Sequence, residues 1–236
     1  DFYRNGNPVN IDLGEQASCP LIINLEAPIT FDSGGRHPEK ICLSNDKESV
    51  DNIAKNHNAV FNLSNNHIFD FGSVGFSDTK EFLKTSNIRH FGVRSPTEEF
   101  GHILHFADDN VCVLAYVHNS CNPVVYAGSY NLVQSSIDQI ICDVQHCRNT
   151  YGDTVDIILN IHGGLEEVGI PEPERVSLAT SCSQIFNVKL IIFHHPHVIQ
   201  PIYKVNGVVV FFSLGNFVFD GFDYINDFGK KSWGVP

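Results

Sequence analysis

Short apolar runs alternate with helical stretches along most of this chain, and this alternation constrains its fold more than any other sequence feature. Strand-like runs occupy residues 21–24, 59–63, 88–91, 155–161 and 189–193. Helical stretches occupy 44–56, 73–86, 131–148 and 172–186, and Ser44 is the expected N-cap of the first. This order predicts an α/β layered fold.

Two further pairs of apolar runs are each joined by a short polar turn. The runs 102–106 and 111–117 form one pair, and 199–203 and 208–213 form the other. Adjacent runs joined in this way predict antiparallel hairpins. We therefore expect mixed sheets and not a purely parallel one.

The length and composition fit one large globular domain over residues 1–236. Hydrophobic residues make up 42% of the 236 residues and charged residues 18%, which excludes a disordered chain or a coiled coil. The longest apolar runs fall far short of the ~20 residues that span a bilayer, so no membrane span is expected in this segment. The seven cysteines contain no C-x-x-C pair, and we expect them to be buried thiols.

The charge balance limits the partners of the chain. Lys and Arg total 15 against 27 for Asp and Glu, which gives a formal net charge of -12 with no basic patch. This excludes a nucleic-acid-binding role, because a phosphate backbone would be repelled. An anionic substrate can still be bound if a cation supplies the positive charge.

Polar side chains that can bind metal follow the ends of five apolar runs. They lie in the segments 24–26, 64–67, 162–164, 194–197 and 214–216. Loops at the carboxyl ends of strands converge on one crevice in α/β sheets. His, Asn and carboxylate groups suit divalent Mn, Zn or Fe, and a pair of such ions can hydrolyse a substrate without a nucleophilic Ser or Cys.

Individual residues in these loops differ in how strongly they indicate a role. His195 and His197 flank Pro196, whose ring favours an extended backbone, and we interpret them as a ligand pair. His162 precedes two glycines that let the chain approach a site closely. Asp70 is expected to accept a hydrogen bond from His67 and orient it. Glu26 could be a ligand or merely a solvated carboxylate.

Several short strings together resemble one family. They are 24–30 (Asn-Leu-Glu-Ala-Pro-Ile-Thr), 64–67 with Asp70 and Gly72, 162–164 with Glu166, 195–197, and 213–217. Their wording and order resemble the bacterial capsule-synthesis CapA family, which includes the poly-gamma-glutamate synthesis protein PgsA, within the calcineurin-like metallophosphoesterase superfamily. The resemblance implies a four-layer αββα sandwich with a two-metal centre.

The resemblance also implies roles for named residues. Asn66 would be a metal ligand and His67 the outer-shell acid, oriented by Asp70. His162 and His195 would bind one metal and His197 the other, while Glu26, with Asn24, would stand in place of the bridging Asp of the superfamily. Asp1 resembles the Asp that ends the family's first strand, so the chain is expected to lack that strand. Glu166 and Asn216 are predicted to contact substrate.

The chain departs from the family and superfamily patterns at three points. Tyr3 stands where the superfamily has His, Glu26 or Asn24 replaces the bridging Asp, and Gly163 replaces an aromatic residue. Two functions therefore stay open. One is metal-dependent hydrolysis of a phosphoester or amide during capsule or poly-gamma-glutamate synthesis, and the other is a non-catalytic role in binding an anionic polymer or a capsule synthase complex. The resemblance implies a membrane-associated, extracytoplasmic setting.

Overall fold

Two β-sheets form the centre of the molecule, as seen in a computed structural model that describes residues 3–4, 7–8, 20–30 and 42–217. The larger sheet has the strand order β12-β13-β11-β10-β7-β6, and the smaller has the order β3-β4-β5. Strands of the larger sheet are β6 (Ile103–Phe106), β7 (Val111–Val117), β10 (Asp156–His162), β11 (Val188–His194), β12 (Ile202–Val205) and β13 (Val208–Phe211). Those of the smaller sheet are β3 (Leu21–Asn24), β4 (Ala59–Asn62) and β5 (Arg89–Phe91).

The strand directions confirm the predicted mixture. Strands β7, β10, β11 and β13 are parallel, whereas β6 pairs with β7 and β12 pairs with β13 in antiparallel hairpins. The three described strands of the smaller sheet are all parallel. Within each sheet, the carboxyl ends of the parallel strands therefore lie together at the same end of the sheet.

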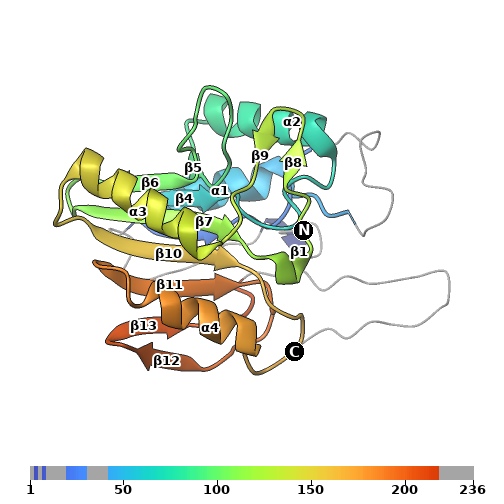
Figure 1. The fold of residues 1–236 in the computed structure, drawn as a ribbon. Helices are drawn as coiled ribbons and strands as arrows, with labels where there is room; N and C mark the ends of the chain where they lie inside the picture. Colours follow the sequence, from blue (N-terminus) through green and yellow to red (C-terminus); the bar gives the residue numbers. More distant parts are fainter. Residues whose placement is uncertain (1–2, 5–6, 9–19, 31–41, 218–236) are drawn as a thin grey trace.

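Helices cover the outer faces of the two sheets, which gives four layers. α1 (Lys47–His57) and α2 (Gly72–Thr85) share one hydrophobic core with β3 and β4, and α3 (Ile137–Tyr151) and α4 (Pro173–Cys182) share another with the larger sheet. A third core of Val60, Phe91, Val113 and Ala115 lies between the sheets. Figure 1 shows α3 and α4 lying over the larger sheet. This is the predicted αββα sandwich.

A polar contact also joins the two sheets. The side chain of Asn62 on β4 donates to Asn160 Oδ1 on β10 at 3.1 Å, and Asn62 Oδ1 accepts from the backbone N–H of Ser64 at 2.9 Å. Both side chains are buried. Because a buried amide must keep its hydrogen bonds, this pair fixes how β4 lies against β10.

Several predicted boundaries were wrong by a few residues. The N-cap of α1 is Asp46, whose side chain accepts from the Ser49 N–H, and not Ser44. α3 begins at Ile137 after the N-cap Ser136, because the preceding residues β8 (Tyr126–Ala127) and β9 (Tyr130–Asn131) pair as a hairpin. That hairpin was not predicted.

Smaller elements complete the described chain. A 3-10 helix, η2 (Asn119–Cys121), follows β7, and β1 (Tyr3–Arg4) pairs with β2 (Asn7–Pro8). α4 ends at Cys182 and not near residue 186, and Ile199 forms only an isolated bridge with Leu214. The six cysteines described form no disulfide, and Cys112, Cys121, Cys147 and Cys182 are buried as predicted. The prediction was wrong for Cys142, which is exposed on α3, and for Cys42, which is half-buried. Among residues 20–30 and 42–217, no helix is both long and apolar enough to cross a bilayer.

Candidate metal centre

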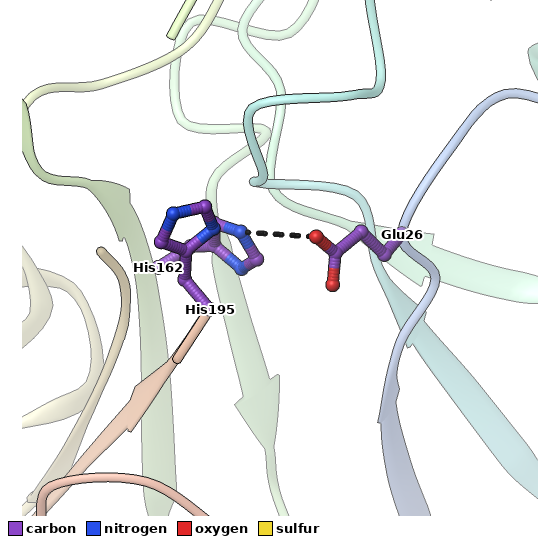
Figure 2. A group of neighbouring side chains, drawn as sticks. All are labelled: Glu26, His162 and His195. Atoms are coloured by element: carbon purple, nitrogen blue, oxygen red, sulfur yellow. Dashed lines mark ion pairs between the residues drawn. The ribbon is translucent and has the colours of Figure 1, made fainter. Parts of the chain in front are cut away.

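The strand ends of both sheets bring metal-competent side chains together. Glu26 follows β3, His162 is the last residue of β10, and His195 follows β11 directly. One ligand atom from each of these three side chains lies within 4.8 Å of the others. Figure 2 shows the two imidazoles beside one another and the Glu26 carboxylate facing His162 across the space between the sheets. The predicted convergence at the carboxyl ends is therefore observed.

His162 lies at the centre of this group. Its Nε2 atom hydrogen-bonds Asn66 Oδ1 at 2.8 Å and lies 3.5 Å from Glu26 Oε1. The His162 side chain is fully buried, and Asn66 and His195 are only 7% and 6% exposed. The His162 and His195 rings lie 5.1 Å apart between centroids. Imidazole, amide and carboxylate groups thus meet at a largely buried site.

Glu26 faces two histidines with one oxygen. Oε1 is 3.5 Å from His162 Nε2 and 3.8 Å from His197 Nε2, and it makes no hydrogen bond to a described residue although it is buried. Burial alone would raise the pKa of Glu26, but the nearby imidazoles of His162, His197 and His67 hold it well below its usual range. Glu26 is therefore a carboxylate, placed between two potential ligands as a bridging group would be.

A second group adjoins the first. One ligand atom each from Glu166, His195 and His197 also lie within 4.8 Å of one another, and Glu166 Oε1 is 3.8 Å from His195 Nε2. His197 Nδ1 hydrogen-bonds Asn216 Oδ1 at 2.8 Å, which leaves Nε2 directed at Glu26. The observed contacts of Glu166 and Asn216 are thus with histidines, and their predicted contact with substrate stays a prediction.

The donor set fits one or two divalent transition metals. Burial is the largest cause that lowers the pKa of His195 to about 3, and the neighbouring imidazole of His162 is the next. His195 is therefore a neutral imidazole near pH 7, the form that binds metal. Glu26 Oε1 is a further sign, because a buried carboxylate oxygen that makes no hydrogen bond to a described residue is costly unless a cation faces it.

The backbone of the His195-Pro196-His197 segment differs from its prediction. We expected an extended conformation, but His195 has φ 102° and His197 has φ 60°. Such values are uncommon for residues other than glycine and cost about 1–3 kcal/mol each. This turn brings the two rings to 5.8 Å between centroids, both near Glu26.

His67 and Asp70 form the predicted dyad beside the metal-competent groups. His67 Nδ1 lies 2.7 Å from Asp70 Oδ2, which also accepts from the Leu43 N–H at 2.8 Å. Asp70 is fully buried, whereas 13% of the His67 side chain is exposed. The position of His67 is close enough for its charge to influence Glu26 and His195.

Buried asparagines whose roles were not predicted hold the loops of the smaller sheet. Asn65 Nδ2 donates to the Leu25 carbonyl at 2.8 Å, and Asn65 Oδ1 accepts from the His67 N–H at 3.1 Å. Asn45 Nδ2 donates to the carbonyl of Ala27, a residue with φ 118°, at 2.9 Å. These amides position Glu26 and His67. In the sequence, only their place beside the motif residues could have indicated this positioning role.

Other predicted ligands are less central. Asn24 Nδ2 donates to Glu26 Oε2 at 3.3 Å, so Asn24 orients the carboxylate. Its Oδ1 is buried and makes no hydrogen bond to a described residue, and its predicted role as a ligand stays a prediction. Asp1 lies outside the described residues, and its predicted role is untested. His194, which lies beside His195 in the sequence, has its pKa lowered to about 4 by burial and is in neither group.

Gly163 allows His118 to pack against the turn after His162. A Cβ atom at position 163 would lie 2.5 Å from His118 Cβ and 3.1 Å from Ser120 Oγ. Ser120 Oγ in turn accepts from the Gly164 N–H at 2.8 Å. The aromatic residue that the resemblance implies at position 163 would therefore not fit against His118 in this arrangement.

Comparison with known proteins identifies the family. The model of the bacterial capsule synthesis protein PGA_cap matches residues 16–221. The chain belongs to this capsule synthesis family. It is 29% identical over 209 residues to the PGA biosynthesis protein CapA of Bacillus subtilis (strain 168), covering 87% of this chain and 54% of that protein. It is 26% identical over 207 residues to the capsule biosynthesis protein CapA of Bacillus anthracis, covering 84% and 49%.

This member of the capsule synthesis family spans about half the length of these curated relatives. Among solved structures, the 5'-nucleotidase precursor from Thermus thermophilus is similar with a TM-score of 0.45 and 15% identity, over 68% of this chain and 34% of that one. The family assignment rests on the sequence matches alone.

Proposed function

We propose that this domain is a divalent-metal-dependent hydrolase of capsule polymer assembly, which cleaves a phosphoester or amide bond in an anionic substrate. One observation carries the proposal. Glu26, from the smaller sheet, presents a buried, unsatisfied oxygen to His162 and His197 of the larger sheet. Structural packing alone gives no reason to bury a carboxylate among imidazoles in this way.

Six residues would hold the cation or cations. Asn66, His162 and His195 would bind one position and His197 the other, with Glu26 between them. Glu166 would complete the second position, because one of its ligand atoms lies within 4.8 Å of one from His197. A bound divalent ion supplies Lewis acidity and lowers the pKa of a water molecule, so that no protein nucleophile is needed.

His67, oriented by Asp70, would give a proton to the leaving group. The Nδ1–H of His67 donates to Asp70, which leaves Nε2 as the atom that can deliver a proton. Water loses one proton to solvent and supplies the hydroxyl that ends on phosphorus or on the acyl carbon. The bond to the leaving oxygen or nitrogen breaks, and that atom takes the Nε2 proton of a doubly protonated His67, which solvent then restores.

The charge of the chain makes substrate binding dependent on the cation. With a formal net charge of -12, and with Glu26 and Glu166 at the site, an anionic polymer would be repelled without a compensating ion. Binding of poly-gamma-glutamate should therefore be lost when a chelator removes the metal.

The experiment compares the wild type with His67→Ala and with a control, His146→Ala, after each is loaded with Mn²⁺. His146 lies on α3 and stacks on Phe100, outside both metal-competent groups. We expect release of nitrophenol from an aryl phosphodiester, or shortening of poly-gamma-glutamate, in the wild type and the control and not in His67→Ala. Metal-dependent polymer binding with no turnover on either substrate would replace the proposal with a scaffold role.

A further inference from the structure

A buried arginine on α4 lies beneath the loops of the candidate metal centre. Arg175 is fully buried on the apolar face that helix α4 presents with Ala179 and Cys182. A guanidinium in such a place is costly unless its donors are paired. Its flat surface also packs on Phe193 and Phe212, with Cζ 5.3 Å and 5.9 Å from the two ring centroids.

The donors of Arg175 reach three different segments. Nε donates to Glu172 Oε2 at 2.6 Å, Nη1 to the Phe212 carbonyl at 2.9 Å, and Nη2 to Gln200 Oε1 at 2.8 Å. Phe212 immediately precedes the segment that ends in Asn216. The fork-shaped group therefore links α4 to two chain segments. One leads from the candidate ligand His197, and the other leads to Asn216, which hydrogen-bonds His197.

Gln200 extends this network to the loop of Glu166. Its Nε2 donates to the carbonyls of Val168 at 2.6 Å and Ile170 at 3.2 Å. Gln200 lies three residues after His197, and Gln200 is itself buried. One amide thus joins the segment that follows Glu166 to the segment that follows His197, and Arg175 holds that amide.

The guanidinium also lies against the turn after His162. Gly164 has φ +134°, and a Cβ there would lie 2.8 Å from Arg175 Cζ and 2.9 Å from Pro196 Cγ. The next part of the turn is joined to the His195-Pro196-His197 segment, because the Glu167 N–H donates to the Pro196 carbonyl at 2.9 Å. Arg175 therefore contacts the place where these two loops meet.

We propose that Arg175 is a positioning residue, which acts through Gln200 and Gly164 to hold His162, Glu166, His195 and His197 in the arrangement that binds metal. The inference rests on the proposed function, since it concerns the same centre. Arg175 itself is too deep to reach substrate, and its donors are directed to protein acceptors.

The test measures Mn²⁺ affinity and, separately, the melting temperature in chelator. Arg175→Lys keeps the charge opposite Glu172 but loses the fork, and Gln200→Ala removes the link to the Glu166 loop. We expect each to weaken Mn²⁺ binding at least about ten-fold, the lower end of the range for groups that orient ligands. The double variant should lose little more than either single one, because both act in one network.

Ile140→Ala is the control for general destabilisation. Ile140 is fully buried on α3 in the same hydrophobic core and belongs to neither metal-competent group. It should lower the melting temperature in chelator and leave Mn²⁺ affinity of the folded protein unchanged. If Ile140→Ala also weakened Mn²⁺ binding in proportion to its lower melting temperature, a specific role for Arg175 would be overturned.

Two further outcomes separate this inference from the proposed function. A wild type that binds no Mn²⁺ overturns the metal centre itself. A wild type that binds Mn²⁺, together with Arg175→Lys and Gln200→Ala proteins of equal affinity, overturns the positioning role alone. If Arg175→Lys does not fold, Gln200→Ala decides the question.

Discussion

The Asp70→Asn substitution tests the proposed proton-transfer dyad without touching a candidate metal ligand. Asp70 Oδ2 accepts two hydrogen bonds, from His67 Nδ1 at 2.7 Å and from the Leu43 N–H at 2.8 Å. An asparagine can present its amide oxygen at the same place, so both bonds can persist, but they lose the carboxylate charge. Bonds to a charged group contribute ~1.5–3 kcal/mol and neutral ones ~1 kcal/mol.

The expected loss at His67 is therefore about 0.5–2 kcal/mol, which corresponds to about 2–30-fold in turnover. The assay is hydrolysis of an aryl phosphodiester by the Mn²⁺-loaded protein, with Mn²⁺ content measured in parallel. Metal content should not change, because Asp70 belongs to neither metal-competent group. Wild-type turnover in Asp70→Asn, or loss of its metal, would refute the assignment of Asp70 as the residue that orients His67.

Three further predictions concern the same centre. Burial lowers the pKa of His194 to about 4 and of His195 to about 3, so the unfolded chain binds protons at these two histidines at a higher pH than the folded chain does. Without metal, the free energy of unfolding should therefore fall by about 1.4 kcal/mol per pH unit for each histidine as the pH falls below ~6. Urea unfolding in chelator measures this, and a flat profile from pH 7 to 5 would contradict it. Gly163→Ala would place Cβ 2.5 Å from His118 Cβ, and should lower stability by ~1–3 kcal/mol and weaken Mn²⁺ binding in titration calorimetry. Wild-type stability and affinity in this variant would contradict the prediction. Glu166→Gln should reduce the Mn²⁺ content of a protein that binds two ions, and unchanged content with a raised KM would favour its predicted contact with substrate instead.

The sequence was most informative where a contact is local. His67 and Asp70 are three residues apart, so their hydrogen bond follows from one short turn and was predicted correctly. The positions of metal-competent residues after strands were also predicted, because parallel strands end at one edge of a sheet. The four-layer arrangement came from the family resemblance, not from the periodicity.

Contacts between the two sheets could not be derived from spacing. The approach of Glu26 to His162 depends on how the sheets pack, which the Asn62 to Asn160 hydrogen bond helps to fix across 98 residues of sequence. The burial of Arg175 was missed for a similar reason, although its i, i+4 relation to Ala179 on an apolar helix face was an available signal. Tertiary contacts decided both positions.

Metal stoichiometry tests the central claim most directly. The measurement is the Mn²⁺ or Zn²⁺ content of purified protein after refilling, for the wild type, for His195→Ala with His197→Ala, and for the control His146→Ala. The wild type and the control should each hold one or two ions per chain, and the double variant should lose most of them. A wild type without bound metal, or a double variant at full occupancy, would show that Glu26, His162, His195 and His197 do not form a metal centre.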